Sequence, residues 1–182
     1  MFENPVVKEI LDWLIHIAIA VIIGLLIVTY VAQRTVVFKH SMEPTLYEGD
    51  NLIVEKITPR FGKLNRGDIV VIKDASPYLA QEGKEIIKRI IAIEGDTIEL
   101  KDGMVILNGE ILEEDYIKDG FTPASPDPGL NKLKVSEGYV YVLGDNRINS
   151  TDSRTIGPVE SKKIRGKAIF RFYPFKKAGV LK

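Results

Sequence analysis

The sequence predicts a mainly β domain attached to one N-terminal transmembrane helix. Residues 14–32 are apolar and contain no Asp, Glu, Lys or Arg. The rest of the chain alternates short Val- and Ile-rich runs with Gly, Pro, Asn and Asp, a pattern typical of β-strands bounded by turns. No long amphipathic helical pattern follows residue 33, so strands should form most of the domain.

The apolar run matches the thickness of a bilayer. At ~1.5 Å per residue, a helix over residues 14–32 is roughly 28 Å long, against ~30 Å for the hydrocarbon core. A cleaved signal peptide is the alternative, but its apolar core spans only about 7–15 residues. The Ala-x-Ala at 18–20 lies inside the run, where no cleavage site belongs. We therefore expect a retained anchor, with Trp13 and Tyr30 as interfacial aromatic residues.

This anchor divides the chain into three parts. Residues 1–13 form a short polar head, 14–32 the transmembrane helix and 33–182 the β domain. The positive-inside rule does not give the orientation, because the single basic residue of the head is outnumbered by those just after the span.

The composition limits the possible partners and catalytic groups of the protein. The chain has 182 residues, with 25 basic and 25 acidic side chains, so nothing indicates a nucleic-acid partner. The absence of Cys excludes disulfides and a thiol nucleophile. The two histidines are His16, inside the apolar run, and His40.

Several runs after the span read as strands, and two Gly-containing dipeptides read as hairpin turns. The turns are Asp102-Gly103 and Asn108-Gly109, and the segment 113–134, rich in Gly, Pro, Asp and Ser, reads as a surface loop. The predicted strands are 36–38, 51–57, 68–73, 85–93, 97–101, 104–107, 139–144 and 167–173.

The first candidate for chemistry is Ser41, which follows the span closely. Pro44 biases Glu43 away from the helical region, so Ser41 should lie on stiff, extended backbone. A serine nucleophile needs a base. Adjacent side chains on extended backbone point to opposite faces, so His40 cannot easily reach Ser41, and a Ser-His-Asp triad is close to excluded.

The candidate base is Lys88, which strand alternation places on one face with Ile86 and Ile90. Desolvation in apolar surroundings lowers a lysine pKa, because the charged form loses its water. Reaching a useful value of ~7–8 from ~10.4 needs about three units, or roughly 4 kcal/mol. The alternative is an edge-strand lysine whose ammonium reaches solvent.

A third candidate is the polar loop at 144–154, which follows a hydrophobic strand and has no apolar periodicity. Its small polar groups indicate a dense hydrogen-bond network, in which Asp152 and Arg154 can form a bracing ion pair. The alternatives are a solvated loop with a weak surface ion pair and a calcium loop, although the EF-hand spacing is missing.

Shorter stretches accompany these three in a fixed order, namely Glu48-Gly49-Asp50, Arg66-Gly67-Asp68-Ile69-Val70-Val71 and Gly95-Asp96. Together with 41–46, 88–91 and 144–154, and behind an N-terminal span, they resemble bacterial type I signal peptidase, peptidase family S26, over nearly the whole chain. The resemblance implies an antiparallel β domain outside the membrane, with residues 1–13 in the cytoplasm.

The resemblance also implies the activity, which is removal of signal peptides from exported preproteins by a Ser-Lys dyad. Ser41 would be the nucleophile and its N–H an oxyanion donor, and Lys88 would be the general base. Ser150 would hydrogen-bond and orient Lys88, while Asp152 and Arg154 hold the loop. The expected partners are preproteins and the lipid bilayer; we expect a monomer with no cofactor and no metal.

The resemblance also implies specificity for small residues at the first and third positions before the cleaved bond. Such side chains require shallow apolar pockets, whose expected walls are Ile53, Val54, Ile86, Ile87 and Ile90.

Four residues depart from the family pattern. Lys39 stands where a Ser or Gly usually helps to form the oxyanion hole, so the second donor is not identified. Ile148 replaces a common Asp, and Ala92 and Glu94 replace a common Gly and Pro. None of these changes removes a catalytic group.

Two other functions are compatible with parts of the pattern. One is another Ser-Lys peptidase, such as a self-cleaving repressor of the SOS type, but that needs a helical DNA-binding domain that residues 1–35 do not form. The other is a membrane-tethered β-rich binding module whose Ser41 and Lys88 are incidental.

Overall fold

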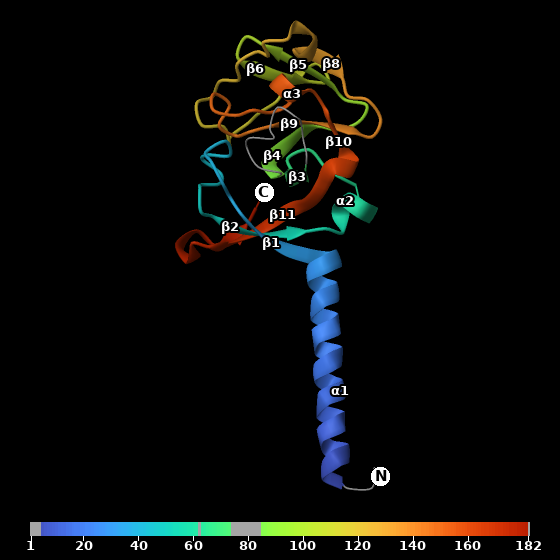
Figure 1. Ribbon diagram of the computed structural model, residues 1–182. Coiled ribbons are helices and arrows are strands. Elements are labelled where there is room, and N and C mark those ends of the chain that lie inside the picture. Colours follow the sequence, from blue (N-terminus) through green and yellow to red (C-terminus); the bar gives the residue numbers. More distant parts are fainter. Residues whose placement is uncertain (1–4, 62, 74–84, 182) are drawn as a thin grey trace.

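A computed structural model describes residues 5–61, 63–73 and 85–181 of the protein. It consists of one long N-terminal helix and a β domain beyond its C-terminal end (Figure 1). The helical elements are α1 Pro5–Leu26, η1 Ile27–Val31, α2 Thr58–Phe61, η3 Pro128–Leu130, α3 Ser153–Ile156, η4 Ser161–Lys163 and η5 Phe175–Lys177. The strands are β1 Ala32–Val36, β2 Asn51–Glu55, β3 Ile69–Lys73, β4 Glu85–Ala92, β5 Thr97–Lys101, β6 Met104–Leu107, β7 Glu110–Ile111, β8 Lys132–Lys134, β9 Tyr139–Leu143, β10 Val159–Glu160, β11 Ile164–Tyr173 and β12 Gly179–Val180.

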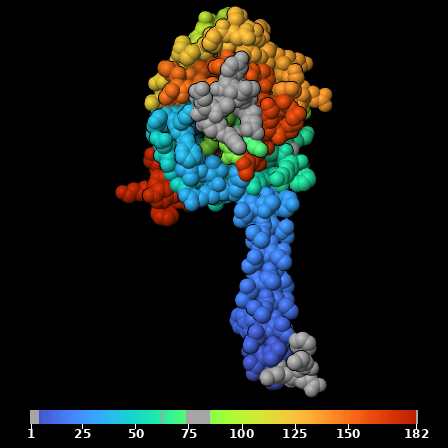
Figure 2. Space-filling view, in the orientation of Figure 1, coloured from blue at the N-terminus to red at the C-terminus, as the bar shows by residue number. Residues whose placement is uncertain are grey.

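The helix α1 projects from the domain with none of its residues buried, and Figure 2 shows it standing clear of the β domain. Together with the π-helical turn η1 it is long and apolar enough to cross a membrane. The described part of α1 starts at Pro5, so residues 5–13 of the expected head are helical. Residues 1–4 of that head lie outside the described part of the chain.

The end of the anchor is tied directly to the β domain. Strand β1 starts at Ala32, immediately after η1, so Ala32 belongs to the sheet and not to the helix. Lys56 Nζ donates to the carbonyls of Val28 and Thr29 at 3.0 and 3.2 Å, and Arg60 Nη1 donates to the Tyr30 carbonyl at 3.4 Å. These bonds satisfy carbonyls that a helix end leaves without partners.

The β domain contains two antiparallel sheets. The larger has the order β1-β2-β11-β3-β4-β9-β10, with β12 paired to β11, and the smaller has the order β7-β6-β5-β8. Figure 1 places β1, β2 and β11 near the helix and β5, β6 and β8 at the far end. The prediction of a mainly β, antiparallel domain with one N-terminal apolar helix is confirmed.

Three hydrophobic clusters hold these sheets. One packs Val70, Ile72, Ile90 and Val142 on one face of the large sheet, and another packs Leu52 and similar residues of β2 and β3 with the turn after β1. The third joins β4 and β9 to the small sheet. Strand alternation therefore sends neighbouring side chains of β4 into different clusters.

The predicted strands differ from the observed ones mainly in where they begin and end. The expected strand 36–38 is displaced, since β1 ends at Val36, and the segment 113–134 is not only a loop. Its last residues form β8, which pairs with β5 through Leu133 and Ile98. A short strand with one apolar residue between two lysines has too little pattern to be detected from the sequence.

Candidate active site

The central contact of the site joins Ser41 and Lys88, which lie 47 residues apart in the chain. Lys88 Nζ is 2.6 Å from Ser41 Oγ, within hydrogen-bond distance. Lys88 is only 4% exposed, whereas Ser41 is half-buried. Burial disfavours the charged ammonium and favours the neutral amine, which is the form that can accept a proton from a hydroxyl.

The two residues are positioned by different kinds of element. Lys88 lies within β4, between β3 and β9, and its backbone pairs with Val70 of β3. Ser41 begins the turn after β1, and that turn is closed by the Leu46 N–H bonding to the Met42 carbonyl at 2.8 Å. Met42 and Leu46 are completely buried. These apolar side chains fix the turn in the core and leave the Ser41 side chain at the surface of the site.

Gly144, just after β9, lies where the turn of Ser41 meets the polar loop. A Cβ atom at this position would lie 2.4 Å from the Ser41 carbonyl oxygen and 2.3 Å from Ser150 Oγ. Both distances are far below van der Waals contact. Glycine is therefore required here because no side chain fits between the two segments.

Asp152 and Arg154 form the bidentate ion pair that the sequence suggested. Arg154 Nε and Nη2 each donate to an Asp152 carboxylate oxygen at 2.8 Å. The Gly144 N–H donates to the same carboxylate at 3.0 Å. Asp152 is fully buried and Arg154 nearly so. The pair therefore fixes the polar loop against the end of β9.

The hydrogen bond expected between Ser150 and Lys88 is not formed. Ser150 Oγ is buried and has no hydrogen-bond partner in the described part of the chain. The hydroxyl lies instead against Gly144, while Lys88 Nζ is directed at Ser41. Ser150 nevertheless lines the same cavity as Ser41 and Lys88.

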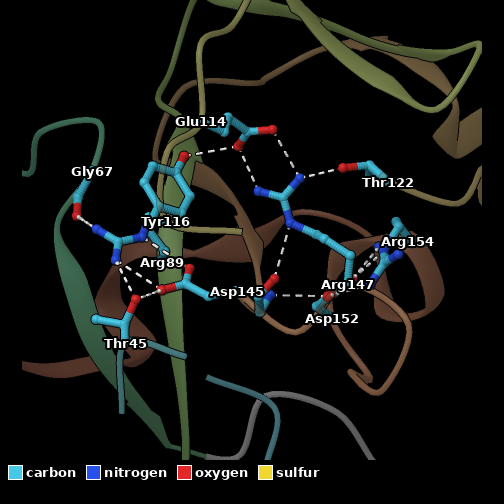
Figure 3. Close-up of polar contacts among 11 residues, drawn as sticks. Thr45, Gly67, Arg89, Glu114, Tyr116, Thr122, Asp145, Arg147, Asp152 and Arg154 are labelled. Atoms are coloured by element: carbon cyan, nitrogen blue, oxygen red, sulfur yellow. Dashed lines mark hydrogen bonds and ion pairs between the residues drawn. The ribbon is translucent and has the colours of Figure 1, made fainter. Parts of the chain in front are cut away.

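A buried ion pair supports the other face of β4. Arg89 donates through Nε and Nη2 to the two oxygens of Asp145, at 2.9 and 2.8 Å, and through Nη1 to the Gly67 carbonyl. Figure 3 shows this group with Thr45, whose hydroxyl donates to Asp145 at 2.5 Å. Burial works against the charge, but the Asp145 carboxylate keeps the pKa of Arg89 above its ordinary value. The contact ties the Ser41 turn to the polar loop.

A second buried arginine, Arg147, extends the network toward the segment 113–134 (Figure 3). Its guanidinium forms a bidentate pair with Glu114 and also donates to the Thr122 hydroxyl. Its Nε donates to the Gly144 carbonyl at 3.0 Å. Both peptide groups of Gly144 are thus held by buried charged side chains.

Ser41 and Lys88 open into a cavity of about 1000 Å³. Ile86 and Ile87 line it, as the sequence suggested, and so do Ile148 and Phe38, which are strongly exposed. No described group of at least three His, Cys, Asp or Glu residues is arranged to hold a metal ion.

The other three expected walls lie elsewhere. The prediction that Val54 and Ile90 form cavity walls is wrong, because both side chains are completely buried in hydrophobic clusters. Ile53 is partly exposed but does not line the cavity among the described residues. Alternation identifies which residues share a face, but it does not show which part of that face stays open.

Sequence reasoning missed the residues that shape the surroundings of the nucleophile. Asn146 and Gly144 are the clearest cases, and Thr45 is another. All belong to the stretches 41–46 and 144–154 that drew attention, but their contacts depend on two turns meeting in space.

A serine hydroxyl next to a buried lysine side chain, in a mainly β domain, is compatible with a serine peptidase that works without histidine. The family model described as signal peptidase, peptidase S26, matches residues 10–173. The chain belongs to this family, and it is a serine peptidase, a hydrolase.

Individual relatives are similar in sequence to this chain over most of its length. A probable signal peptidase I-1 from Synechocystis is 37% identical and covers 90% of this chain and 82% of its own. Signal peptidase I from Leptolyngbya laminosa is 39% identical, covering 91% and 80%, and signal peptidase I S from Bacillus subtilis is 37% identical, covering 92% and 91%. A signal peptidase I crystal structure from Enterococcus faecalis is 31% identical, with a TM-score of 0.46 over 58% of this chain and 96% of that one.

Proposed function

We propose that this protein is a membrane-anchored endopeptidase that removes N-terminal signal peptides from exported preproteins with a Ser-Lys dyad. The observation that carries the proposal is the 2.6 Å contact between Ser41 Oγ and the buried Lys88 Nζ. Membership of the signal peptidase family supports the substrate class.

The chemistry follows from this contact. Ser41 Oγ attacks the carbonyl carbon of the cleaved peptide bond and gives its proton to the neutral Lys88 amine, forming a tetrahedral oxyanion. Collapse of the oxyanion breaks the C–N bond, and the Lys88 ammonium protonates the leaving amine of the mature protein. Water then attacks the acyl ester and gives a proton to Lys88. The Lys88 ammonium returns that proton to Ser41 Oγ as the ester bond breaks, and the freed carboxyl group of the signal peptide loses its proton to solvent.

The open edges around the cavity suit an extended peptide. The edge strand β1 pairs only with β2 among the described strands, and β4 pairs with β9 only from Arg89 onward. Residues of both strands line the cavity with Ser41. An unpaired strand edge offers backbone donors and acceptors to an added strand, and Ile86 and Ile87 would face small substrate side chains.

The helix α1 and the surface beside it suit a lipid bilayer. Arg60 contacts the end of the anchor, and its neighbour Phe61 is 84% exposed, as expected for an aromatic side chain that enters the interface. A signal peptide is itself inserted in the membrane, so anchoring raises the effective concentration of enzyme and substrate. We infer that the N-terminal end of α1 is cytoplasmic and that the domain from residue 33 onward is outside, where preproteins emerge.

Cleavage of a preprotein by the full-length protein in detergent or lipid tests the proposal. Ser41→Ala and Lys88→Ala should each abolish processing while the β domain stays folded. Lys88→Arg should also be inactive, because arginine cannot lose its proton at working pH. Lys101→Arg, on the exposed end of β5, is the matched control. Turnover by Ser41→Ala above background would refute the nucleophile, and turnover by Lys88→Arg would refute the base.

A further inference from the structure

Asn146 holds both carbonyl groups that flank the nucleophile. Its side-chain Nδ2 donates to the His40 carbonyl at 3.0 Å, and its backbone N–H donates to the Ser41 carbonyl at 3.0 Å. Asn146 is only 5% exposed. One buried residue from the polar loop thus fixes two consecutive peptide groups of a distant turn.

The bond from Asn146 to the His40 carbonyl helps to fix the direction of the Ser41 N–H. The His40–Ser41 peptide is trans, since the cis peptides of the described chain are at two X-Pro bonds. In a planar trans peptide the C=O and N–H point in opposite directions. With the His40 carbonyl held against Asn146, the Ser41 N–H must point away from Asn146.

That direction is the open side of the site. Ser41 and His40 line the cavity, whereas Asn146 does not. No group among the described residues accepts a hydrogen bond from the Ser41 N–H. A donor that faces the cavity beside the Ser41 hydroxyl is placed to bind the oxyanion formed when that hydroxyl attacks a carbonyl.

We propose that Asn146 is a positioning residue that orients the Ser41 N–H as the oxyanion donor; this rests on the proposed role of Ser41 as nucleophile. Within the turn, the Glu43 N–H also donates to the His40 carbonyl, at 3.2 Å, so Asn146 supplies the shorter of the two bonds that hold this peptide. Lys39, just before His40, has a φ of 70°, in the left-handed region that residues with a Cβ rarely adopt. A turn under this strain keeps its conformation only where surrounding contacts fix it.

The inference predicts a loss in the chemical step and not in substrate binding. Oxyanion donors act where charge develops in the transition state, and removing one costs about 10²–10³ in kcat. Asn146→Ala removes the side-chain donor but keeps the backbone bond to the Ser41 carbonyl. Its kcat should fall about 100-fold or more, with KM changed by less than about threefold. Asn146→Asp, which sets a carboxylate against the His40 carbonyl, should lose at least as much.

Two further measurements separate positioning from structural support. A peptide aldehyde that forms a tetrahedral adduct on Ser41 should bind Asn146→Ala about 100-fold more weakly, in parallel with kcat, because the adduct needs the same donor. Asn131→Ala is the matched control, since Asn131 Nδ2 donates to the Ser125 carbonyl at 3.1 Å in a loop outside the cavity. This control should keep its kcat whatever it loses in thermal stability.

The outcomes are distinct. If Ser41→Ala still turns over in the same assay, the proposed function fails. If Ser41→Ala is inactive but Asn146→Ala keeps kcat within about twofold, or keeps its affinity for the aldehyde, only the role of Asn146 is overturned. Failure of both Asn146 variants to fold, measured by thermal unfolding in detergent, would also overturn it, because the residue would then be structural.

Discussion

The ion pair between Asp152 and Arg154 gives a stability prediction that can be worked from its contacts. In Asp152→Ala the Arg154 guanidinium stays in a site where its side chain is 6% exposed. Removing one partner of a buried ion pair costs about 3–5 kcal/mol, because the other charge is left without compensation. The Gly144 N–H also loses its acceptor, which adds about 1–3 kcal/mol if no water replaces it. We expect the free energy of unfolding to fall by more than about 3 kcal/mol.

A loss of that size is measurable in the full chain. It corresponds to a fall in Tm of roughly 6 °C or more for a domain of this length, followed in detergent by near-UV circular dichroism. The double variant Asp152→Ala/Arg154→Leu should recover part of the loss, because the buried charge is gone. The matched control is Glu160→Ala, which breaks an ion pair of the same i,i+2 spacing whose Lys162 is 80% exposed. The control should show no measurable change.

The reasoning would be refuted by a small effect. If the free energy of unfolding of Asp152→Ala lies within about 1 kcal/mol of the wild-type value, or is no lower than that of Glu160→Ala, then burial does not make this ion pair important for stability. A double variant no more stable than Asp152→Ala would show that the uncompensated charge of Arg154 is not the cause.

Three further predictions concern catalysis, pH and topology. Ser150→Ala should lower kcat more than it raises KM. It should not lower Tm, because the buried Ser150 hydroxyl has no described hydrogen-bond partner to lose. Unchanged kinetics would show that Ser150 has no role in the site. Asp96 is desolvated, but bonds from Arg66, Asn108 and the Ile93 N–H lower its pKa from 3.8 to about 2. The ionised Asp96 therefore stabilises the fold above pH 3.8, and this stabilisation is lost as pH falls through about 2. In urea unfolding, Asp96→Asn should lower the free energy of unfolding by about 2 kcal/mol at pH 7 but by little at pH 2. An equal cost at both pH values would contradict this. Protease added to intact protoplasts should digest the domain from residue 33 onward; digestion only after the membrane is opened would reverse the topology.

The sequence supports the fold more fully than it supports the site. Hairpin dipeptides and Val/Ile runs are local signals, and β5 and β6 begin and end where the sequence predicted. The strand β8 was not found, because it depends on pairing with β5 and has little pattern of its own. The end of the anchor was also placed one residue late, since Ala32 is apolar enough for the helix but pairs with Glu55 in the sheet.

The proposed catalytic pair could be selected from the sequence where chemistry and resemblance agree. A serine nucleophile without a usable histidine needs another base, and the motifs that contain Ser41 and Lys88 resemble those of the signal peptidase family. Asn146 and Gly144 could not be selected in this way, because their roles are to hold a peptide group and to leave room for one. Those roles exist only once the two turns lie together.

The proposed role of Lys88 as base is supported by its burial, which distinguishes it from the other lysines around the cavity. Lys39, Lys73 and Lys88 all line it, but only Lys88 is buried. Lys39 and Lys73 are exposed, whereas Lys88 Nζ lies 2.6 Å from Ser41 Oγ. His40 also lines the cavity, but its Nδ1 lies 2.8 Å from Glu43 on the exposed side of the turn. The position of Lys88 inside β4, and not merely its distance from Ser41, is therefore what makes it the expected general base.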